Sequence, residues 1–363
     1  MPACLDTLLI GLYCLADDLL EPRSGAGRPP RLSDAELICL AVAQVLLDVP
    51  GDRRFLALAR WRLGHLFPYL PKQPGYNKRV RALAPQIVRL LNIIAFESPS
   101  FGDALWLLDG TPVPCGTSRE TARRSELAGY AAYGYCRSQH RFFWGFRLIL
   151  VCAPDGMPIG FDLVAANVPE RQAAAEILQR LPLAGRTVIA DKGFAGAEFE
   201  QLIADLGGRL LRPDRKNEAH RHGALGAVRQ WIESVFDTLN GQLSLERHGA
   251  RTLPGLMARI AARLLALAAG LRHNQLAGTW DRSLIAYDHQ PRPIGIDHLA
   301  PSACFRPSGW RPVPLSRSRD SGSGRSARQS GRTSRRRSSS GRWPGETASA
   351  SASQPVSSVL PHG

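Results

Sequence analysis

The chain has 363 residues, 44% of them hydrophobic, which is enough to build two domains with a core and excludes a chain that is disordered throughout. Lys and Arg number 46 against 31 Asp and Glu, so the net charge of +15 favours a polyanionic partner, nucleic acid before membrane. Residues 301–363 hold 11 Arg and 2 acids, a local charge of +9, which leaves +6 for residues 1–300 and makes the body only moderately basic.

Residues 1–98 predict a helical domain. Ser33 and Glu36 have the spacing of a capping box and precede apolar residues at helical spacing, so a helix should begin at Asp34. Two more helices are expected, over residues 53–63 and 76–96. Pro85 should break or kink the last of them.

Three basic residues near the start of that last helix are candidate DNA contacts: Lys78, Arg79 and Arg81. Small basic helical bundles often bind DNA. A charged face that only contacts solvent produces the same sequence, so both interpretations stay open. We call residues 1–98 a helical DNA-binding domain as a hypothesis.

From residue 104 the pattern changes to strands. In LWLLDGTPVPCG, an apolar run is followed by Asp109 and a glycine, which predicts a short buried strand ending at a turn with the carboxylate at its carboxyl end. RTVIADKGF repeats this pattern, with an expected strand over residues 187–190 followed by Asp191. The alternative for Asp109 is that it only shapes a turn.

The order of the expected elements predicts a mixed sheet. Strands over residues 141–153 and 157–166 should form a hairpin at Asp155-Gly156. Alternating helices and strands follow, with helices from about 170, 196 and 227 and a strand at 209–212. A helical crossover favours parallel pairing, so the first strand should lie beside the fourth, and Asp109 and Asp191 should then meet at one edge.

A third acid, Glu233, borders the apolar stripe of the helix that begins near residue 227. Pairing with Arg229, four residues earlier, is the structural alternative for this carboxylate. Asp109, Asp191 and Glu233 lie 82 and 42 residues apart. Converging carboxylates repel one another, and two Mg²⁺ or Mn²⁺ ions would remove that repulsion and could assist an attack on phosphorus.

Five motifs stand in order along the chain: LWLLDGTPVPCG, GYCRSQHRFFWGFRLILVCAPDGMPIGFDLVAAN, RTVIADKGF, RQWIESVFDTLN and LERHGARTLPGL. Together they resemble the DDE transposases of bacterial insertion sequences, most closely the group numbered nine-eight-two. The helical start, from LSDAELICLAVAQ through HLFPYLPKQPGYNKRVRAL, resembles the amino-terminal region of the same group. The resemblance covers about residues 5–275.

The resemblance implies an α/β fold, with a ribonuclease H-like mixed sheet flanked by helices over residues 99–275. It also implies metal-dependent nicking at terminal inverted repeats and joining of the freed 3′-hydroxyl to target DNA, and we expect a homodimer in the DNA complex. By this resemblance the three metal-binding acids are Asp109, Asp191 and Glu233. Lys192 and Arg229, which neighbour two of these acids, are candidate DNA or phosphate contacts.

Two positions depart from the family pattern. Related transposases often carry a tyrosine before this arginine and a lysine after the glutamate, where this chain has Gly226 and Asn240. The departure bears on strand transfer and leaves the three acids in place. A catalytically decayed remnant that only binds DNA, and a general nuclease of the same fold, are therefore the alternatives to an active transposase.

Residues 276–363 are rich in Ser, Arg, Gly and Pro, which predicts a disordered basic tail that either grips phosphates or has no role. Seven cysteines without a C-x-x-C pair favour a reducing cytoplasm, where we expect the protein to associate with the nucleoid. The apolar run over 253–271 contains Arg259 and Arg263, so an amphipathic helix is expected rather than a membrane span.

Other candidate sites are weaker. His220 to His222 have no third ligand at a recognisable spacing, so a surface loop is expected. Cys115 and Cys136 have no evident base partner, which favours structural roles. Four aromatic residues of the hairpin could stack on bases but are more typical of a core: Phe142, Phe143, Trp144 and Phe146. Without a phosphate-binding loop, no nucleotide cofactor is expected.

Overall fold

The computed structural model describes residues 4–20, 30–136, 140–214, 218, 226–279 and 282–287, and for residues 226–229 it describes the backbone alone. The expected basic tail beyond residue 287 and the loop at His220 to His222 lie outside these residues.

Five helices precede the sheet: α1 (Leu5–Leu19), α2 (Asp34–Leu46), α3 (Asp52–Arg62), α4 (Gln73–Ala82) and α5 (Ala84–Glu97). The capping box is confirmed, because the Ser33 side chain accepts a hydrogen bond from the Glu36 backbone N–H while the Glu36 carboxylate accepts one from the Ser33 N–H. The expected break is also confirmed, since α4 and α5 are separate helices with Pro85 in the first turn of α5.

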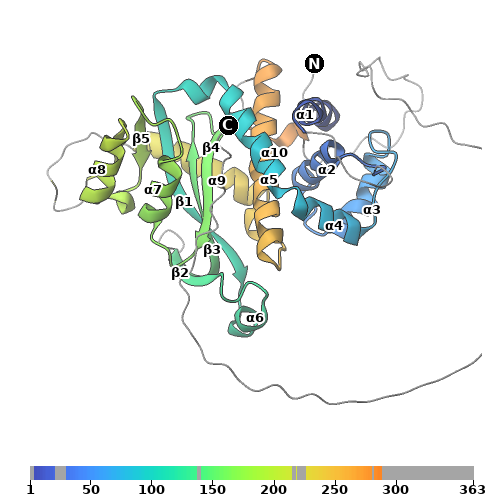
Figure 1. The fold of residues 1–363 in the computed structure, drawn as a ribbon, viewed down its shortest axis with the longest axis horizontal. Helices are drawn as coiled ribbons and strands as arrows, with labels where there is room; N and C mark the ends of the chain where they lie inside the picture. The colour runs from blue at the N-terminus through green and yellow to red at the C-terminus, as the bar shows by residue number, and fades with distance from the viewer. Residues whose placement is uncertain are drawn as a thin grey trace, which may run out of the picture. The chain divides into compact units, whose positions relative to one another are not determined.

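The second half of the described chain builds a six-stranded mixed sheet flanked by helices (Figure 1). The elements in chain order are β1 (Leu105–Gly116), α6 (Arg119–Arg124), β2 (Ala132–Cys136), β3 (Arg141–Cys152), β4 (Pro158–Ala165), α7 (Glu170–Leu178), β5 (Thr187–Ala190), α8 (Ala197–Asp205), β6 (Arg209–Leu211), α9 (Gly226–Asp237) and α10 (Leu253–Leu276).

The strand order is β2-β3-β1-β5-β6, and β4 pairs with β3 beyond the end of β2. β1 pairs with β5 and β5 with β6 in parallel, whereas the pairs made by β3 are antiparallel. The first expected strand therefore lies beside the fourth, as the crossover rule predicts. This arrangement confirms the α/β class, the mixed sheet flanked by helices and the helical amino-terminal region.

The expectation that the first strand ends at Asp109 is wrong. β1 runs for 12 residues, from Leu105 to Gly116, and Asp109-Gly110 lies inside it without a turn. The reason is that β1 has two partners of different length. β5 pairs with it only as far as Leu108, whereas β3 stays paired up to Gly116.

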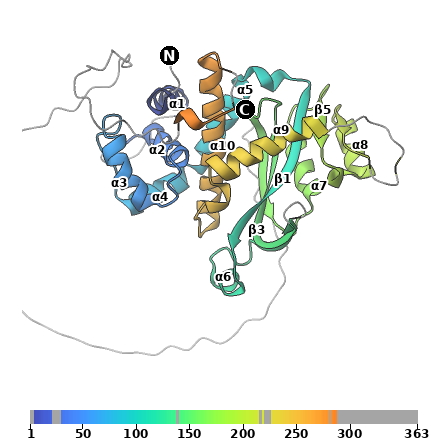
Figure 2. The ribbon, with the colours of Figure 1, turned by 180° about the vertical axis from the view of Figure 1, so that it is seen from behind.

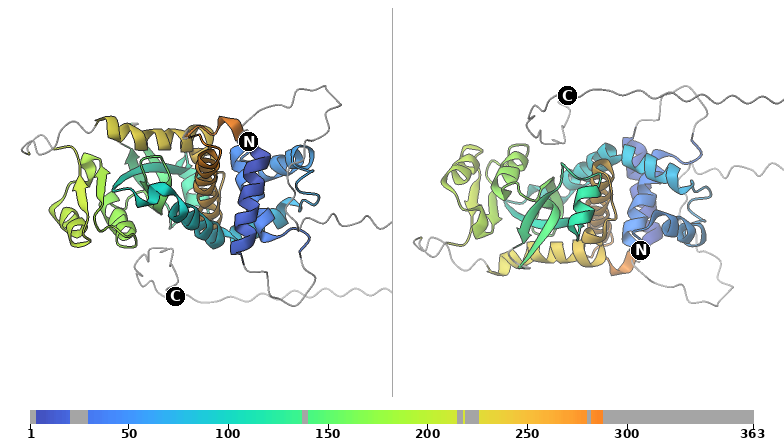
Figure 3. Two further views of the ribbon diagram at one scale, coloured as in Figure 1. Left: turned by 90° about the horizontal axis from the view of Figure 1, so that it is seen from above. Right: turned by 90° about the horizontal axis from the view of Figure 1, so that it is seen from below.

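Helices cover both faces of the sheet. α7 packs on β3 and β4 on one face, where Ile177 and Leu181 lie close to Gly160. On the other face α9 contacts β1, and α5 and α10 contact β4. Seen from above, α10 lies between the sheet and the amino-terminal helices (Figure 3).

This position makes α10 buried around its circumference, so the expectation of an amphipathic helix over 253–271 is wrong. Periodicity could not predict this, because one side of α10 faces the sheet and the other faces α1, α2, α4 and α5. Within the described residues α10 alone is long and apolar enough to cross a membrane by length and composition. Because 78% of its apolar window is buried inside the protein, it is a core helix of this fold.

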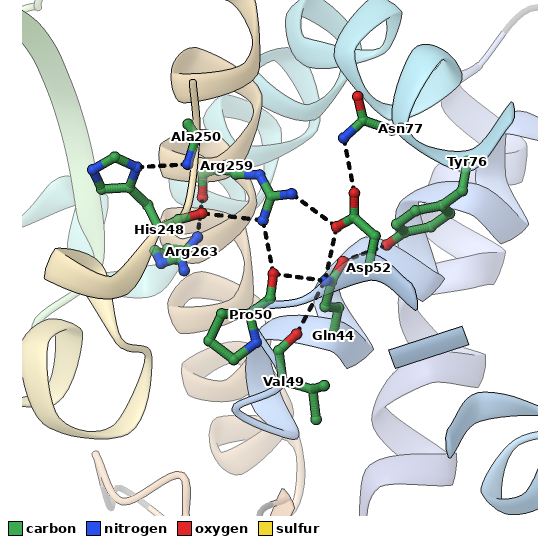
Figure 4. Close-up of polar contacts among 10 residues, drawn as sticks. All are labelled: Gln44, Val49, Pro50, Asp52, Tyr76, Asn77, His248, Ala250, Arg259 and Arg263. Atoms are coloured by element: carbon green, nitrogen blue, oxygen red, sulfur yellow. Dashed lines mark hydrogen bonds and ion pairs between the residues drawn. The ribbon is translucent and has the colours of Figure 1, made fainter. Parts of the chain in front are cut away.

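Two arginines of α10, Arg259 and Arg263, lie inside a polar network (Figure 4). Arg259 donates to Asp52 Oδ1 of α3 at 2.8 Å, and Asp52 also accepts hydrogen bonds from Gln44 and Asn77. Arg263 is 4% exposed and donates to the backbone carbonyls of Ser244 and Arg259. Burial of these charges is tolerated because each has hydrogen-bond partners, and the network joins the amino-terminal helices to α10.

Candidate functional site

Two of the three predicted acids occupy equivalent positions on neighbouring strands. Leu108 of β1 is paired with Ala190 of β5, and each is followed directly by an aspartate, Asp109 and Asp191. Adjacent strands lie about 4.8 Å apart, so parallel pairing places the two acidic residues side by side. The sheet therefore brings together two carboxylates that are 82 residues apart in sequence.

Local backbone contacts hold both aspartates. Asp109 Oδ1 accepts a hydrogen bond from the Gly110 N–H at 2.7 Å, and Asp191 Oδ1 accepts one from the Lys192 N–H at 2.7 Å. Both residues are partly exposed, at the point where β5 ends and the chain turns into a short 3-10 helix over Lys192–Phe194. Each carboxylate is thus oriented by the backbone N–H of the residue that follows it.

Glu233 lies on α9, the helix that crosses β1 (Figure 2). Ile232, Val235 and Phe236 are buried and anchor the helix, whereas Glu233 is exposed. Trp231, on the same helix, is 38% exposed. The third acid therefore projects from a helix whose apolar side is fixed against the sheet.

The donor set suits a hard divalent cation, because carboxylate oxygens are the ligands that Mg²⁺ and Mn²⁺ prefer. As the side chains are placed, however, no three His, Cys, Asp or Glu residues in the described part of the chain gather closely enough to hold a metal ion. The fold places Asp109 beside Asp191 and packs α9, the helix of Glu233, on β1. It does not bring the three carboxylates within reach of one cation.

Three residues near these acids differ in their surroundings: Lys192, Arg229 and Asn240. Lys192 is exposed immediately after Asp191. Arg229 lies in α9, but its side chain is outside the described atoms. Asn240 lies in the π-helical turn that continues α9, and its buried Oδ1 atom has no hydrogen-bond partner within the described structure.

The three basic candidates of α4 differ in their surroundings. Lys78 is exposed, whereas Arg79 donates to the Asp34 carboxylate at 2.7 Å and to the Leu32 carbonyl at 2.9 Å. Arg81 is half-buried near the first turn of α10. Of the three, Lys78 is the one whose side chain is exposed to solvent.

Cys115 is not an activated thiol. Cys115 Sγ lies 3.9 Å from His248 Nε2, a contact that the sequence did not suggest. Burial raises the pKa of Cys115 to about 12, and it lowers the pKa of His248 to about 4. A histidine with so low a pKa is too weak a base to take a proton from so weakly acidic a thiol, so this pair does not act as a nucleophile and base at neutral pH.

The hairpin aromatics divide between core and surface. Phe143, Trp144 and Phe146 are buried, as expected, but Phe142 is 79% exposed. Sequence reasoning did not single out Tyr133 and Tyr135 of β2, which are also exposed. Strand alternation through GYAAYGYC was the available signal.

The fold and the site together define an α/β protein that presents an acidic pair after two adjacent parallel strands. Residues 101–269, fewer than half of the chain, match the family model described as Transposase DDE domain. The match begins just before β1, ends inside α10 and contains Asp109, Asp191 and Glu233. Over these residues the chain is similar to a transposase DDE domain.

Among solved structures, the chain is similar to the cryo-EM structure of the piggyBac transposase synaptic complex with hairpin DNA. The identity is 10% and the TM-score is 0.35, over 76% of this chain and 74% of that chain. No curated protein matches the chain.

Proposed function

We propose that the protein is a DNA transposase that cuts and joins phosphodiester bonds at the ends of an insertion sequence of the group numbered nine-eight-two. Asp109, Asp191 and Glu233 would be its metal-binding acids. The observation that carries the proposal is the equivalent placement of Asp109 and Asp191 after the last parallel pair of β1 and β5. The match of residues 101–269 to the transposase DDE domain supports the same assignment.

The chemistry follows from the donor set. When bound, two Mg²⁺ or Mn²⁺ ions supply activation of a water or a 3′-hydroxyl and stabilisation of the leaving oxygen in an in-line displacement at phosphorus. Asp109 and Asp191 would hold the ions from the sheet, and Glu233 would complete the set from α9. Lys192 and Arg229 contact phosphates beside the acids and orient the strand. No side chain forms a covalent bond to DNA in this proposal.

The DNA partners are the terminal inverted repeats and the target DNA, bound by a homodimer. Lys78 is the basic residue of α4 best placed for a phosphate contact, because its side chain is exposed. Arg79 and Arg81 were proposed with it, and the contacts of Arg79 with Asp34 and Leu32 assign it a structural task as well. Neutralisation of phosphates by such residues makes binding salt-dependent.

A catalytically decayed remnant that only binds DNA is the second candidate. The observation that favours it is Asn240, which stands where related transposases often have a lysine and whose Oδ1 is buried without a partner in the described structure. A lysine after the glutamate would contribute a charge to strand transfer that an amide lacks. Loss of this charge does not remove the three acids.

The test is cleavage of a duplex that carries the inverted repeats flanking the coding region, with Mg²⁺ or with EDTA. An active transposase cuts at the repeat ends only with Mg²⁺, and Asp109→Asn abolishes the cut. Binding without cleavage would establish the decayed remnant. Equal cutting of a duplex with shuffled repeats would establish a general nuclease, and cleavage that survives Asp109→Asn would reject the assigned site.

A further inference from the structure

A row of aromatic side chains extends along one face of the β2–β3 pair. Tyr133 is directly opposite Trp144, and Tyr135 is directly opposite Phe142. Directly opposite residues of an antiparallel pair lie on the same face, and so do residues two apart on one strand. All four rings therefore share a face, and the Tyr135 and Phe142 ring centroids are 4.8 Å apart.

The outer rings of this row are not part of the core. Phe142 is 79% exposed, Tyr133 56% and Tyr135 40%. The opposite face of the same strands provides the local packing, where Phe143 is buried with Cys136 and Ala166. Exposed aromatic groups gathered at one place are typical of a binding surface.

A groove lies between this row and α6. Its volume is about 510 Å³, and Arg119 and Arg123 of α6 line it together with Tyr133 and Trp144. Both arginines are exposed, and within the described residues neither has an acidic partner, whereas the nearby Arg124 pairs with Glu120. The groove thus combines uncompensated guanidinium groups with aromatic walls.

The aromatic row continues the face of the sheet that carries Asp109. Asp109 is opposite Leu150, and steps of two along β3 lead from Leu150 to Trp144. Trp144 is opposite Gly116, seven residues beyond Asp109 on β1, which corresponds to roughly 24 Å of strand. Figure 1 shows α6 beside the end of the β1–β3 pair, away from β5.

We propose that this groove, with Tyr133 on its wall as a stacking platform and Arg119 and Arg123 as phosphate contacts, binds an unpaired stretch of DNA during the reaction, and that Phe142 extends the stacking surface beyond the groove on the same strand face. The inference rests on the proposed function only in taking DNA as the substrate. It adds a second DNA site, at the end of the β1–β3 pair away from the acids.

Single-stranded DNA is the occupant that the side chains fit. Every unpaired base offers a flat π-face to an aromatic ring, whereas the bases of a duplex are already stacked on one another. Arginines along the same groove neutralise the phosphates that connect the bases. A protein partner could fill the groove only if it presented carboxylates to Arg119 and Arg123, whereas any single strand of DNA presents both bases and phosphates.

The experiment measures binding of the full chain to a fluorescein-labelled 20-nucleotide single strand of mixed sequence and to the same sequence as a duplex, by fluorescence anisotropy. Tyr133→Ala and Phe142→Ala should each weaken single-strand binding about tenfold and change duplex binding less than twofold. Tyr133→Phe keeps the ring and should bind like the parent. Phe96→Ala removes an aromatic side chain that is 71% exposed outside the groove, and is the matched control.

Because Phe142 is 79% exposed, its replacement leaves the core intact, and Arg119→Gln with Arg123→Gln is a second variant that removes no core atoms. Unchanged single-strand affinity in these variants, or equal loss on single strand and duplex, would overturn the inference and point to another occupant or to plain charge attraction. Asp109→Asn should not alter single-strand binding. Absence of cleavage would therefore reject the proposed function and leave this inference standing. Loss of the single-strand preference would reject this inference and leave the proposed function standing.

Discussion

Arg259 of α10 donates a hydrogen bond to Asp52 of α3 at 2.8 Å, across 207 residues of sequence, and the side chain of Asp52 is only 6% exposed. Arg259→Met removes the only guanidinium that contacts this carboxylate within the described structure. Since a buried charge without its partner is costly, we expect a loss of about 3 kcal/mol in the free energy of unfolding. Urea denaturation monitored by circular dichroism measures this loss.

The matched control is Arg272→Met on the same helix, where Arg272 pairs with Glu97 at 2.9 Å and both side chains are more exposed. Exposed pairs contribute little, so we expect a change below about 1 kcal/mol. Equal effects of the two variants would show that the network of Figure 4 is not a determinant of stability.

His248 should make stability depend on pH. The His248 Nδ1 atom accepts from the Ala250 N–H, and Nε2 contacts the Pro114 carbonyl, so the ring is neutral. Burial, assisted by the charges of Arg263 and Arg259, lowers its pKa to about 4. The unfolded ring has a pKa near 6.5, so between pH 6.5 and 4 the unfolded state binds more protons. Stability is therefore fully present above pH 6.5 and declines by about 3 kcal/mol as the pH falls to 4.

The measurement is the free energy of unfolding from urea titrations between pH 4.5 and 7.5, for the parent chain and for His248→Gln. The parent should lose more stability on acidification than the variant, and the difference isolates His248 from the carboxylates that titrate in the same range. His65→Gln, at a histidine that is 44% exposed, should behave like the parent. Parallel curves for the parent and His248→Gln would contradict the prediction.

The sequence predicted the elements that are set by residues close to them in the chain. The capping box of Ser33, the hairpin at Asp155-Gly156 and the strand before Asp191 all follow from residues within a few positions. β1 was predicted too short because its length depends on pairing with β3, which begins 25 residues after β1 ends. α6 was not predicted, since residues 117–128 contain no sustained helical periodicity, and β2 was missed although the sequence alternates along it.

The site was predictable to the extent that topology determines it. Once β1 was expected beside β5, the placement of Asp109 next to Asp191 followed from parallel pairing. The positions of the basic residues along α4 could not predict which of them can contact DNA. Arg79 donates to Asp34, which is 45 residues upstream and lies on another helix. The exposure of Phe142 was equally hidden, since it depends on which face of the hairpin the core occupies.

The different surroundings of Lys78 and Arg79 predict opposite effects of two neighbouring substitutions. Lys78→Ala should reduce by about 0.9 the slope of log binding constant against log salt concentration on duplex DNA, since one phosphate contact is lost. Its unfolding free energy should change by less than about 0.5 kcal/mol. Arg79→Ala should instead lower the unfolding free energy by about 2 kcal/mol, because the contacts with Asp34 and Leu32 are lost.

Both quantities come from fluorescence anisotropy at several salt concentrations and from urea denaturation of the same preparations. Reversal of the two effects would show that Arg79 is the DNA contact and that its link to Asp34 contributes little. An unchanged salt slope in Lys78→Ala would remove this residue from the proposed DNA surface.

The last prediction concerns the metal response of the acid pair. A cation that binds only the folded protein stabilises it by about 1.4 kcal/mol at ten times its dissociation constant. The parent chain should therefore gain stability as Mg²⁺ is added, and Asp191→Asn should lose this gain because one of the two adjacent carboxylates no longer offers a charged ligand. Asp103→Asn, at an exposed acid just before β1, should keep the full response. Thermal denaturation across a Mg²⁺ titration distinguishes these outcomes, and an equal response of Asp191→Asn and Asp103→Asn would place the cation elsewhere.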